Sequence, residues 1–192
     1  IMSVLFFDEM RFDPKDPKAY DVDVFVMSKG HAAPILWSAL KLAGGISEDL
    51  KSLRKFTSTL EGHPTPRNPW VRVATGSLGQ GLGSACGMAW ARKKDGHPGR
   101  VFTLMGDGEV TEGSVFEAAA FAAQEGLTNL VAIVDVNAFG QSGPTMLVHD
   151  TGAYARRFEA FGWTAVECDG HDIAAVQAAF ARVRSAKRPS VI

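Results

Sequence analysis

Val101-Phe102-Thr103-Leu104-Met105-Gly106-Asp107-Gly108 decides the fold, because a short apolar run ends there in an aspartate between two glycines. A second apolar run, 130–134, leads into Asp135-Val136-Asn137, so that Asn137 follows Asp107 by 30 positions. Runs of this length are typical of buried strands in a parallel sheet. The alanine-rich stretch 114–126 between them predicts a helix. Right-handed strand–helix–strand units bring both strand ends to one edge of a sheet, so we expect Asp107 and Asn137 to meet there.

A carboxylate and an amide oxygen at one sheet edge indicate a particular ligand chemistry. Open parallel sheets bind their ligands outside the carboxyl ends of the strands. Mg²⁺ prefers oxygen ligands, takes few of them from the protein and keeps phosphate oxygens in its octahedron. The pattern therefore predicts a metal-bridged diphosphate site at Asp107 and Asn137. The alternative is that the two residues cap helices or turns, where both residue types are favoured.

The rest of the chain alternates between strand-like and helix-like stretches. Strands are expected near 24–28, 101–106, 130–136, 163–168 and 190–192, and helices near 1–10, 32–43, 47–55, 79–94, 114–126, 151–161 and 172–186. The longest irregular stretch is 57–77, and long loops in a compact domain are usually functional. Strands alternating with helices predict an α/β fold in which helices flank both faces of a parallel sheet.

Composition excludes several classes of protein. With 192 residues and 46% hydrophobic content, the chain can bury one sizeable core. Its net charge of −1 gives no electrostatic basis for binding nucleic acid or an anionic membrane. No apolar run approaches the length of a membrane-spanning helix, and no signal peptide is visible. Cys86 and Cys168 lie far apart in apolar settings, as free thiols do in a reducing compartment, so we expect a cytoplasmic protein.

Four motifs occur in one order along the chain, and together they resemble the cofactor-binding half of transketolase, in its animal-type branch. They are Ser28-Lys29-Gly30-His31-Ala32-Ala33-Pro34, Glu61-Gly62-His63-Pro64, Ala74-Thr75-Gly76-Ser77-Leu78-Gly79-Gln80-Gly81-Leu82-Gly83 and Gly106-Asp107-Gly108-Glu109-Val110-Thr111-Glu112-Gly113-Ser114. The last motif, followed by Asn137, resembles the thiamin diphosphate signature. The resemblance covers 1–192 and implies a thiamin diphosphate-binding fold, with the chain forming a single diphosphate-binding domain.

The resemblance also implies roles for individual residues. The expected catalytic residues are His31, His63, Glu112 and Glu117; the cofactor-binding residues are His31, Gly76, Ser77, Leu78, Gly108, Glu109 and Asn137; the metal ligands are Asp107, Asn137 and Phe139. The implied cofactors are thiamin diphosphate and Mg²⁺, for which Ca²⁺ or Mn²⁺ can substitute.

The histidines and glutamates each have a second interpretation. Imidazole suits a sugar-binding site because it donates, accepts and changes charge near neutral pH. The resemblance puts His31 near the diphosphate and the reacting centre and His63 at the sugar hydroxyls, and it makes Lys29 a further candidate for stabilising negative charge. A single histidine is more often a surface or core residue. Glu112 and Glu117 are either helix-start carboxylates favoured by the helix dipole or, by resemblance, part of a subunit interface.

The implied reaction transfers a two-carbon ketol unit from a ketose phosphate to an aldose phosphate. The expected partners are sugar phosphates and a pyrimidine-binding domain, on the same longer chain or on a second subunit, within a homodimer or heterotetramer. We expect a domain truncated at both ends, because the family's early Gly-His-Pro segment would precede Ile1, and no pyrimidine-binding or C-terminal domain is present. The glutamate that drives ylid formation belongs to the pyrimidine-binding domain, so the chain alone is expected to be inactive.

Two alternatives remain open at this point. One is a related thiamin diphosphate enzyme, such as a deoxyxylulose-phosphate synthase or a 2-oxoacid dehydrogenase component. The pairing of His31 with His63 disfavours it, because the resemblance ties both histidines to sugar-phosphate handling. The other is a non-catalytic homologue, against which the presence of all four of Asp107, Asn137, His31 and His63 speaks.

Overall fold

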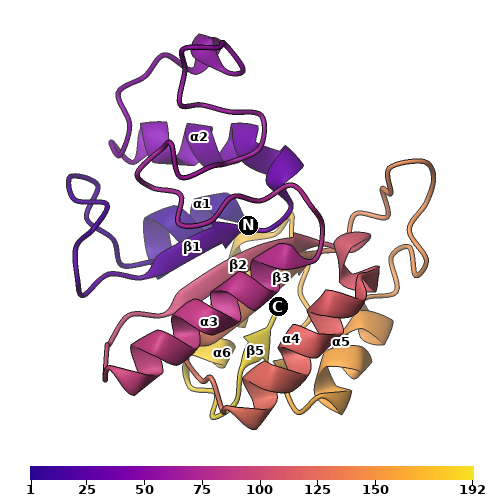
Figure 1. Ribbon diagram of the computed structural model, residues 1–192. Helices are drawn as coiled ribbons and strands as arrows, with labels where there is room; N and C mark the ends of the chain where they lie inside the picture. Colours follow the sequence, from indigo (N-terminus) through magenta and orange to yellow (C-terminus); the bar gives the residue numbers. More distant parts are fainter.

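The computed structural model describes residues 1–192. The fold is built on a five-stranded sheet. The strands are β1 (Val24–Met27), β2 (Val101–Gly106), β3 (Leu130–Asp135), β4 (Thr164–Ala165) and β5 (Ser190–Val191). Their order across the sheet is β1-β2-β3-β5-β4, and every neighbouring pair is parallel. The predicted α/β class is therefore confirmed, and the carboxyl ends of all five strands lie at one edge (Figure 1).

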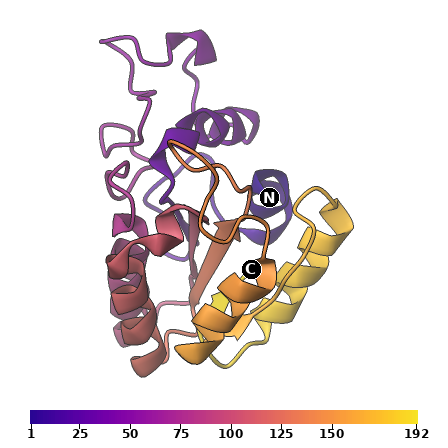
Figure 2. The ribbon, with the colours of Figure 1, turned by 90° about the vertical axis from the view of Figure 1, so that its right-hand side faces the viewer.

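Helices cover both faces of this sheet (Figures 1 and 2). The α-helices are α1 (Met2–Val4), α2 (Ala33–Leu42), α3 (Gln80–Lys94), α4 (Gly113–Gln124), α5 (Thr151–Ala160) and α6 (Ile173–Arg184). The shorter turns are a π-helix η1 (Leu5–Glu9) and 3₁₀-helices η2 (Gly30–Ala32), η3 (Leu50–Ser52) and η4 (Glu109–Thr111). None of these helices is both long enough and apolar enough to cross a membrane.

The central strands divide their side chains between two cores because successive strand residues point to opposite faces. In β2, Phe102 and Leu104 pack with α1, α2 and α6, whereas Val101 and Met105 pack with α3, α4 and α5. The neighbouring strand β3 alternates in the same way. Every residue of β2 is buried. A strand that is covered on both faces needs apolar residues at nearly every position, which explains the apolar run directly before the GDG motif.

Three predicted elements differ from the structure in length or type. The helix expected at 47–55 is wrong, because only the single turn η3 forms there. Asp49 is the N-cap of this turn and its carboxylate accepts the backbone N–H of Lys51, but Leu53 has ψ 128° and Arg54 has a left-handed φ of 63°, so the backbone leaves the helical region after one turn. The helix expected at 1–10 forms as α1 followed by η1. The strand expected at 163–168 shortens to β4, which is an edge strand pairing with β5 alone.

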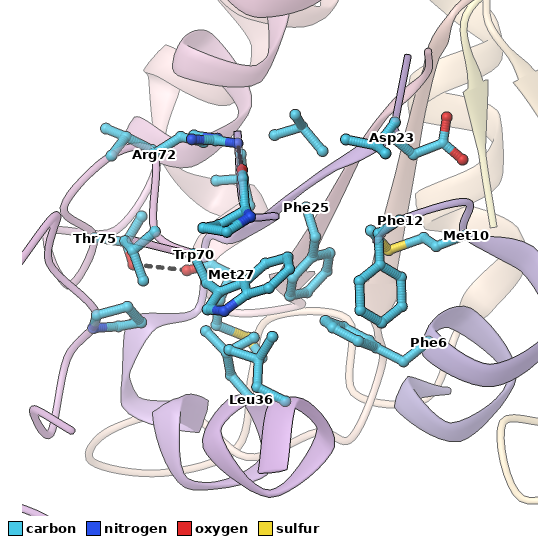
Figure 3. Close-up of a pocket in the computed structure, with 18 residues that line it drawn as sticks. Phe6, Met10, Phe12, Asp23, Phe25, Met27, Leu36, Trp70, Arg72 and Thr75 are labelled. Carbon is cyan, nitrogen blue, oxygen red and sulfur yellow. Dashed lines mark hydrogen bonds between the residues drawn. The ribbon is translucent and has the colours of Figure 1, made fainter. Parts of the chain in front are cut away.

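An aromatic cluster packs beside β1 and supports the long loop before α3 (Figure 3). Phe6, Phe12, Phe25 and Trp70 meet in edge-to-face pairs at centroid distances of 5.5 to 5.7 Å. They line a small cavity of about 40 Å³. At one end of the cluster the Thr75 hydroxyl donates to the Met27 carbonyl at 2.7 Å. The cluster and this bond bring the end of the loop to the carboxyl end of β1.

Candidate functional site

The GDG turn and the end of β3 are joined by direct hydrogen bonds. The two strands run in register to Gly106 and Asp135, and the Asp107 N–H donates to the Asp135 carbonyl at 3.2 Å. One step further on, the Ala138 N–H donates to Asp107 Oδ2 at 2.9 Å. The Asp107 carboxylate therefore contacts the backbone directly after Asn137, at the start of the loop that follows β3. The structure places Asp107 and Asn137 at one sheet edge, as the strand pattern predicts.

The Asp107 carboxylate is held firmly by the protein. It is 1% exposed and accepts the Gly108 N–H on Oδ1 at 3.0 Å and the Thr145 hydroxyl on Oδ2 at 2.7 Å, in addition to Ala138. All three partners are N–H or O–H donors, and together they fix the orientation of the carboxylate.

The donor set at this place suits a hard cation. Asn137 Oδ1 accepts the Phe139 N–H at 2.9 Å, and no protein group donates to the Phe139 carbonyl. The side chain of Phe139 is 85% exposed, so its backbone lies at the surface of the site. No three His, Cys, Asp or Glu residues cluster as metal ligands anywhere in the chain. One carboxylate, one amide and one carbonyl oxygen therefore fit an ion such as Mg²⁺, provided that phosphate oxygens complete its shell.

Glycines let two backbone segments meet just after β1, where the His63 ring also packs. A Cβ on Gly30 would lie 2.8 Å from the backbone nitrogen of Gly76, which side chains do not tolerate. Gly76 itself has φ 141°, and the His63 ring lies 3.0 Å from the place of its missing Cβ. The segment 76–79 thus packs tightly on the first turn after β1, and Ser77 and Leu78 remain exposed at its surface. Backbone groups at such a place can approach a ligand closely.

His31 and His63 lie on the same side of the site, and both side chains are exposed. Partial burial of the imidazole lowers the pKa of His31 below 6.5, and the charges of Lys29 and His63 lower it further. His31 is therefore neutral at pH 7, and a neutral imidazole can both donate and accept a hydrogen bond. The structure brings together the two histidines that the sequence singled out.

Lys29 forms an ion pair that the sequence did not predict. Its Nζ lies 2.7 Å from Asp135 Oδ2, and its side chain is 8% exposed. The same oxygen accepts Asn137 Nδ2 at 3.0 Å. Burial by itself would raise the pKa of Asp135, but the bonds from Lys29 and Asn137 and the lysine charge outweigh burial and hold that pKa below 3.8. Asp135 precedes Asn137 by two positions at a strand end, and this spacing could have indicated a shared face.

Glu109 is turned into the protein. It is 2% exposed, and its carboxylate accepts the Ser28 hydroxyl, the Gly79 N–H at 3.0 Å and the Gly106 N–H at 3.3 Å. Burial raises the pKa of Glu109 above its ordinary value, against the lowering effect of these bonds. The side chain thus joins the ends of β1 and β2 to the glycine segment before α3. The predicted role of Glu109 in cofactor binding stays a prediction.

Glu112 and Glu117 lie at and near the start of α4, and Glu112 packs on the glycine segment before α3, since its Cβ lies 2.7 Å from the place of a Cβ on Gly79. Glu112 is the N-cap residue of α4 without a capping side-chain bond, and both carboxylates are exposed. The same helix exposes Phe121 by 43%. Their predicted place at a subunit interface stays a prediction.

Comparison with known proteins gives one consistent result. Residues 1–192 match the family described as "Transketolase, thiamine diphosphate binding domain". The chain is 55% identical to transketolase-like protein 2 of Bos taurus over 100% of its own length and 31% of that protein. It is 52% identical to transketolase of Homo sapiens over 96% of its length and 30% of that protein. A transketolase structure from Campylobacter jejuni superposes with a TM-score of 0.93 at 33% identity, covering 100% of this chain and 31% of that one. The chain thus spans about a third of the length of these relatives.

Proposed function

Because the chain belongs to the transketolase family as its thiamine diphosphate binding domain, we propose that the protein carrying it is a transketolase. The proposed reaction moves a two-carbon ketol unit from a ketose phosphate to an aldose phosphate. The observation that supports it most is the Asp107 carboxylate, buried and bonded to the Ala138 N–H between Asn137 and Phe139. When bound, thiamin diphosphate would supply the ring that accepts electrons as the carbon–carbon bond breaks.

We assign the diphosphate and its metal to the edge formed by the ends of β2 and β3. Asp107, Asn137 Oδ1 and the Phe139 carbonyl would hold Mg²⁺, and Ca²⁺ or Mn²⁺ offer the same preference for oxygen. The glycine segment 76–79 and Gly108 would let the cofactor lie close to the backbone. The ion pair with Asp135 holds the ammonium group of Lys29 beside the metal-binding turn. That ammonium group would balance part of the negative charge of the diphosphate.

Sugar handling is assigned to the two histidines. Neutral His31 can exchange a hydrogen bond with a hydroxyl or phosphate oxygen, and its lowered pKa keeps it able to accept a proton near neutral pH. His63 packs on Gly76 and would contact the sugar hydroxyls from the same side as His31. A solved transketolase from Pichia stipitis is a complex with sedoheptulose 7-phosphate, which supports sugar phosphates as the substrate class.

The proposal includes a second domain type. A relative from Phocaeicola vulgatus, 43% identical over 90% of this chain, is named as one of the subunits of an apulose-4-phosphate transketolase, which supports a separate partner domain or polypeptide. We propose that a pyrimidine-binding domain completes the site from the same longer chain or from a second subunit. Glu112, Glu117 and Phe121 on the open face of α4 would form part of that contact, in a homodimer or heterotetramer.

The test is a ketol-transfer assay with xylulose 5-phosphate and ribose 5-phosphate. It is run on the full-length protein, or the assembly, that carries this chain, with and without added thiamin diphosphate and Mg²⁺. Formation of sedoheptulose 7-phosphate that requires both additions is the expected result. The 192-residue chain alone, assayed in parallel, should give none. If the assembly binds the cofactor but transfers no ketol unit, a related thiamin diphosphate reaction or a non-catalytic homologue replaces the proposal.

A further inference from the structure

The loop 136–150 closes on the metal-binding aspartate through one threonine. Thr145 is 8% exposed, and its hydroxyl donates to Asp107 Oδ2 at 2.7 Å. Its backbone N–H donates to the Ala138 carbonyl at 3.2 Å, while the Ala138 N–H donates to the same Asp107 oxygen at 2.9 Å. Thr145 and Ala138 therefore hold each other and the carboxylate in a closed ring of hydrogen bonds.

The surroundings leave the Thr145 hydroxyl little choice of partner. Its methyl group packs beside two glycines, 3.5 Å from the place of a Cβ on Gly108 and 3.7 Å from that on Gly140. Tyr154 is 3% exposed beneath the loop, and its hydroxyl lies beside Thr145 without completing a hydrogen bond of normal geometry. A threonine hydroxyl has one hydrogen to donate. The structure directs that hydrogen to Asp107.

We propose that Thr145 is a positioning residue for the metal-binding carboxylate, whose hydroxyl fixes the rotation of the Asp107 carboxyl group for Mg²⁺. The inference rests on the function proposed above. Mg²⁺ demands near-ideal octahedral geometry, so a carboxylate that turns about its own bond binds it less well. Partners that orient a metal-binding side chain commonly contribute about 10- to 100-fold to metal affinity.

If Thr145 only anchored the loop, its substitution would change stability and not the affinity for the cation. The hydroxyl also helps to hold the loop 136–150, so its loss could lower stability without touching the metal. The two roles separate because positioning acts on the affinity for the cation, whereas loop anchoring acts on unfolding in the absence of cation. Positioning also leaves turnover intact once the cation is saturating, because excess cation refills the site.

The experiment compares three substitutions in the full-length protein that carries this chain. Thr145→Val removes the hydroxyl and keeps the shape, and Thr145→Ser keeps the hydroxyl. Thr103→Val is the matched control, since Thr103 is 0% exposed and its hydroxyl has no partner. Isothermal titration with Mg²⁺, and with Mn²⁺ as a second probe, is done at saturating thiamin diphosphate. Thermal unfolding is followed without cation, and the KM for Mg²⁺ and kcat are measured separately.

The expected result is a loss of cation affinity confined to one variant. Thr145→Val should weaken Mg²⁺ and Mn²⁺ binding by about tenfold or more and raise the KM for Mg²⁺ in proportion, with kcat at saturating Mg²⁺ nearly unchanged. Thr145→Ser and Thr103→Val should keep wild-type affinity. If Thr145→Val does not fold, Thr145→Ala is compared with Thr145→Ser in its place, and the same difference in affinity is expected.

Two results overturn the inference. One is wild-type cation affinity in the variant that lacks the hydroxyl. The other is an equal loss of affinity in Thr145→Ser, which would trace the effect to the shape of the loop. A wild-type protein that does not bind thiamin diphosphate with Mg²⁺ at all would instead contradict the proposed function, so the two failures are distinguishable.

Discussion

The Asp107 carboxylate is almost completely buried and accepts three hydrogen bonds, and this makes it the most sensitive position of the site. We expect Asp107→Ala to abolish Mg²⁺-dependent binding of thiamin diphosphate, because the only carboxylate of the donor set is removed. Titration calorimetry with the full-length protein measures this. Asp172→Ala is the control: Asp172 caps α6 through the Ala174 N–H, so its loss should cost about 1 kcal/mol of stability and leave binding unchanged. Normal binding by Asp107→Ala would make the metal assignment wrong.

His31 offers a test of the electrostatics at the same scale. Its imidazole should titrate below pH 6.5 in an NMR experiment, because burial and the charges of Lys29 and His63 disfavour the charged form. Lys29→Met should raise that pKa, since it removes one positive charge and leaves Asp135 unpaired. Lys187→Met, which removes an exposed charge near the other end of the chain, should leave it unchanged.

The pKa of His31 also sets the sign of a stability effect. Its folded pKa is lower than its unfolded value of 6.5, so the unfolded state binds more protons as the pH falls. The contribution of His31 to stability is therefore complete above pH 6.5 and is lost as the pH drops through the folded pKa. A titration midpoint above 6.5 would contradict both statements.

At the scale of residues, the sequence predicts the site residues that stand at strand ends or within the four motifs. Asp107 and Asn137 each follow an apolar run, and parallel topology alone brings them together. Thr145 is different. The bond from Thr145 to Asp107 spans 38 positions and arises from the path of an irregular loop, for which no periodicity in the sequence exists. Side-chain pairs of this kind become visible only when the loop is folded.

At the scale of elements, Glu109 joins the ends of β1 and β2 to the segment before α3. We expect Glu109→Gln to destabilise the 192-residue chain by about 1–3 kcal/mol, because an amide NH₂ in place of one carboxylate oxygen would face a backbone N–H and leave it unsatisfied. Chemical denaturation measures the change. Glu159→Gln on the exposed face of α5 should stay within about 0.5 kcal/mol of wild type. Equal stability of the two variants would show that the three bonds of Glu109 contribute little.

Helices and strands also differ in how well the sequence pattern predicts their ranges. The central elements β2, α4 and β3 match their predicted ranges closely, since their apolar periods are long and their ends carry glycine or polar residues. The predicted helix at 47–55 forms one turn, because Asp49 caps its start but the backbone leaves the helical region at Leu53 and Arg54. The predicted strand at 163–168 is shortened because strand length depends on the partner, and β5 pairs with only two of its residues.

At the scale of the whole molecule, a charged cluster ties the first residues to the sheet and to the last helix. Arg100 bonds to Glu9 and Asp23, and Arg184 bonds to Glu9 as well. The carboxylates of Glu9 and Asp23 are only 1% and 4% exposed, so they depend on these arginines. The cluster joins η1 to Arg100, directly before β2, and to the end of α6, which are far apart in sequence.

We expect Arg100→Met to destabilise the 192-residue chain by about 3 kcal/mol. That value lies at the lower end for a broken buried ion pair, since Arg184 still reaches Glu9. Methionine keeps an apolar contact on Phe102, over which the guanidinium lies at 4.8 Å. The matched control is Arg156→Met: the Arg156 side chain is 70% exposed and pairs with Asp150 at 4.0 Å, so its loss should change stability by less than about 0.5 kcal/mol. Denaturation of both variants decides whether the cluster has this role.

The stretch around the single turn η3, between α2 and the loop that reaches the site, should be the first place at which a protease cuts the chain. Phe56 is 98% exposed there, and only η3 gives the surrounding stretch regular structure. Segments of this kind are the preferred sites of proteolytic nicking. Chymotrypsin should therefore cleave first after Phe56, giving two bands on a denaturing gel. The two pieces should still elute as one particle from a sizing column, because β1 on the first piece stays paired with β2 on the second.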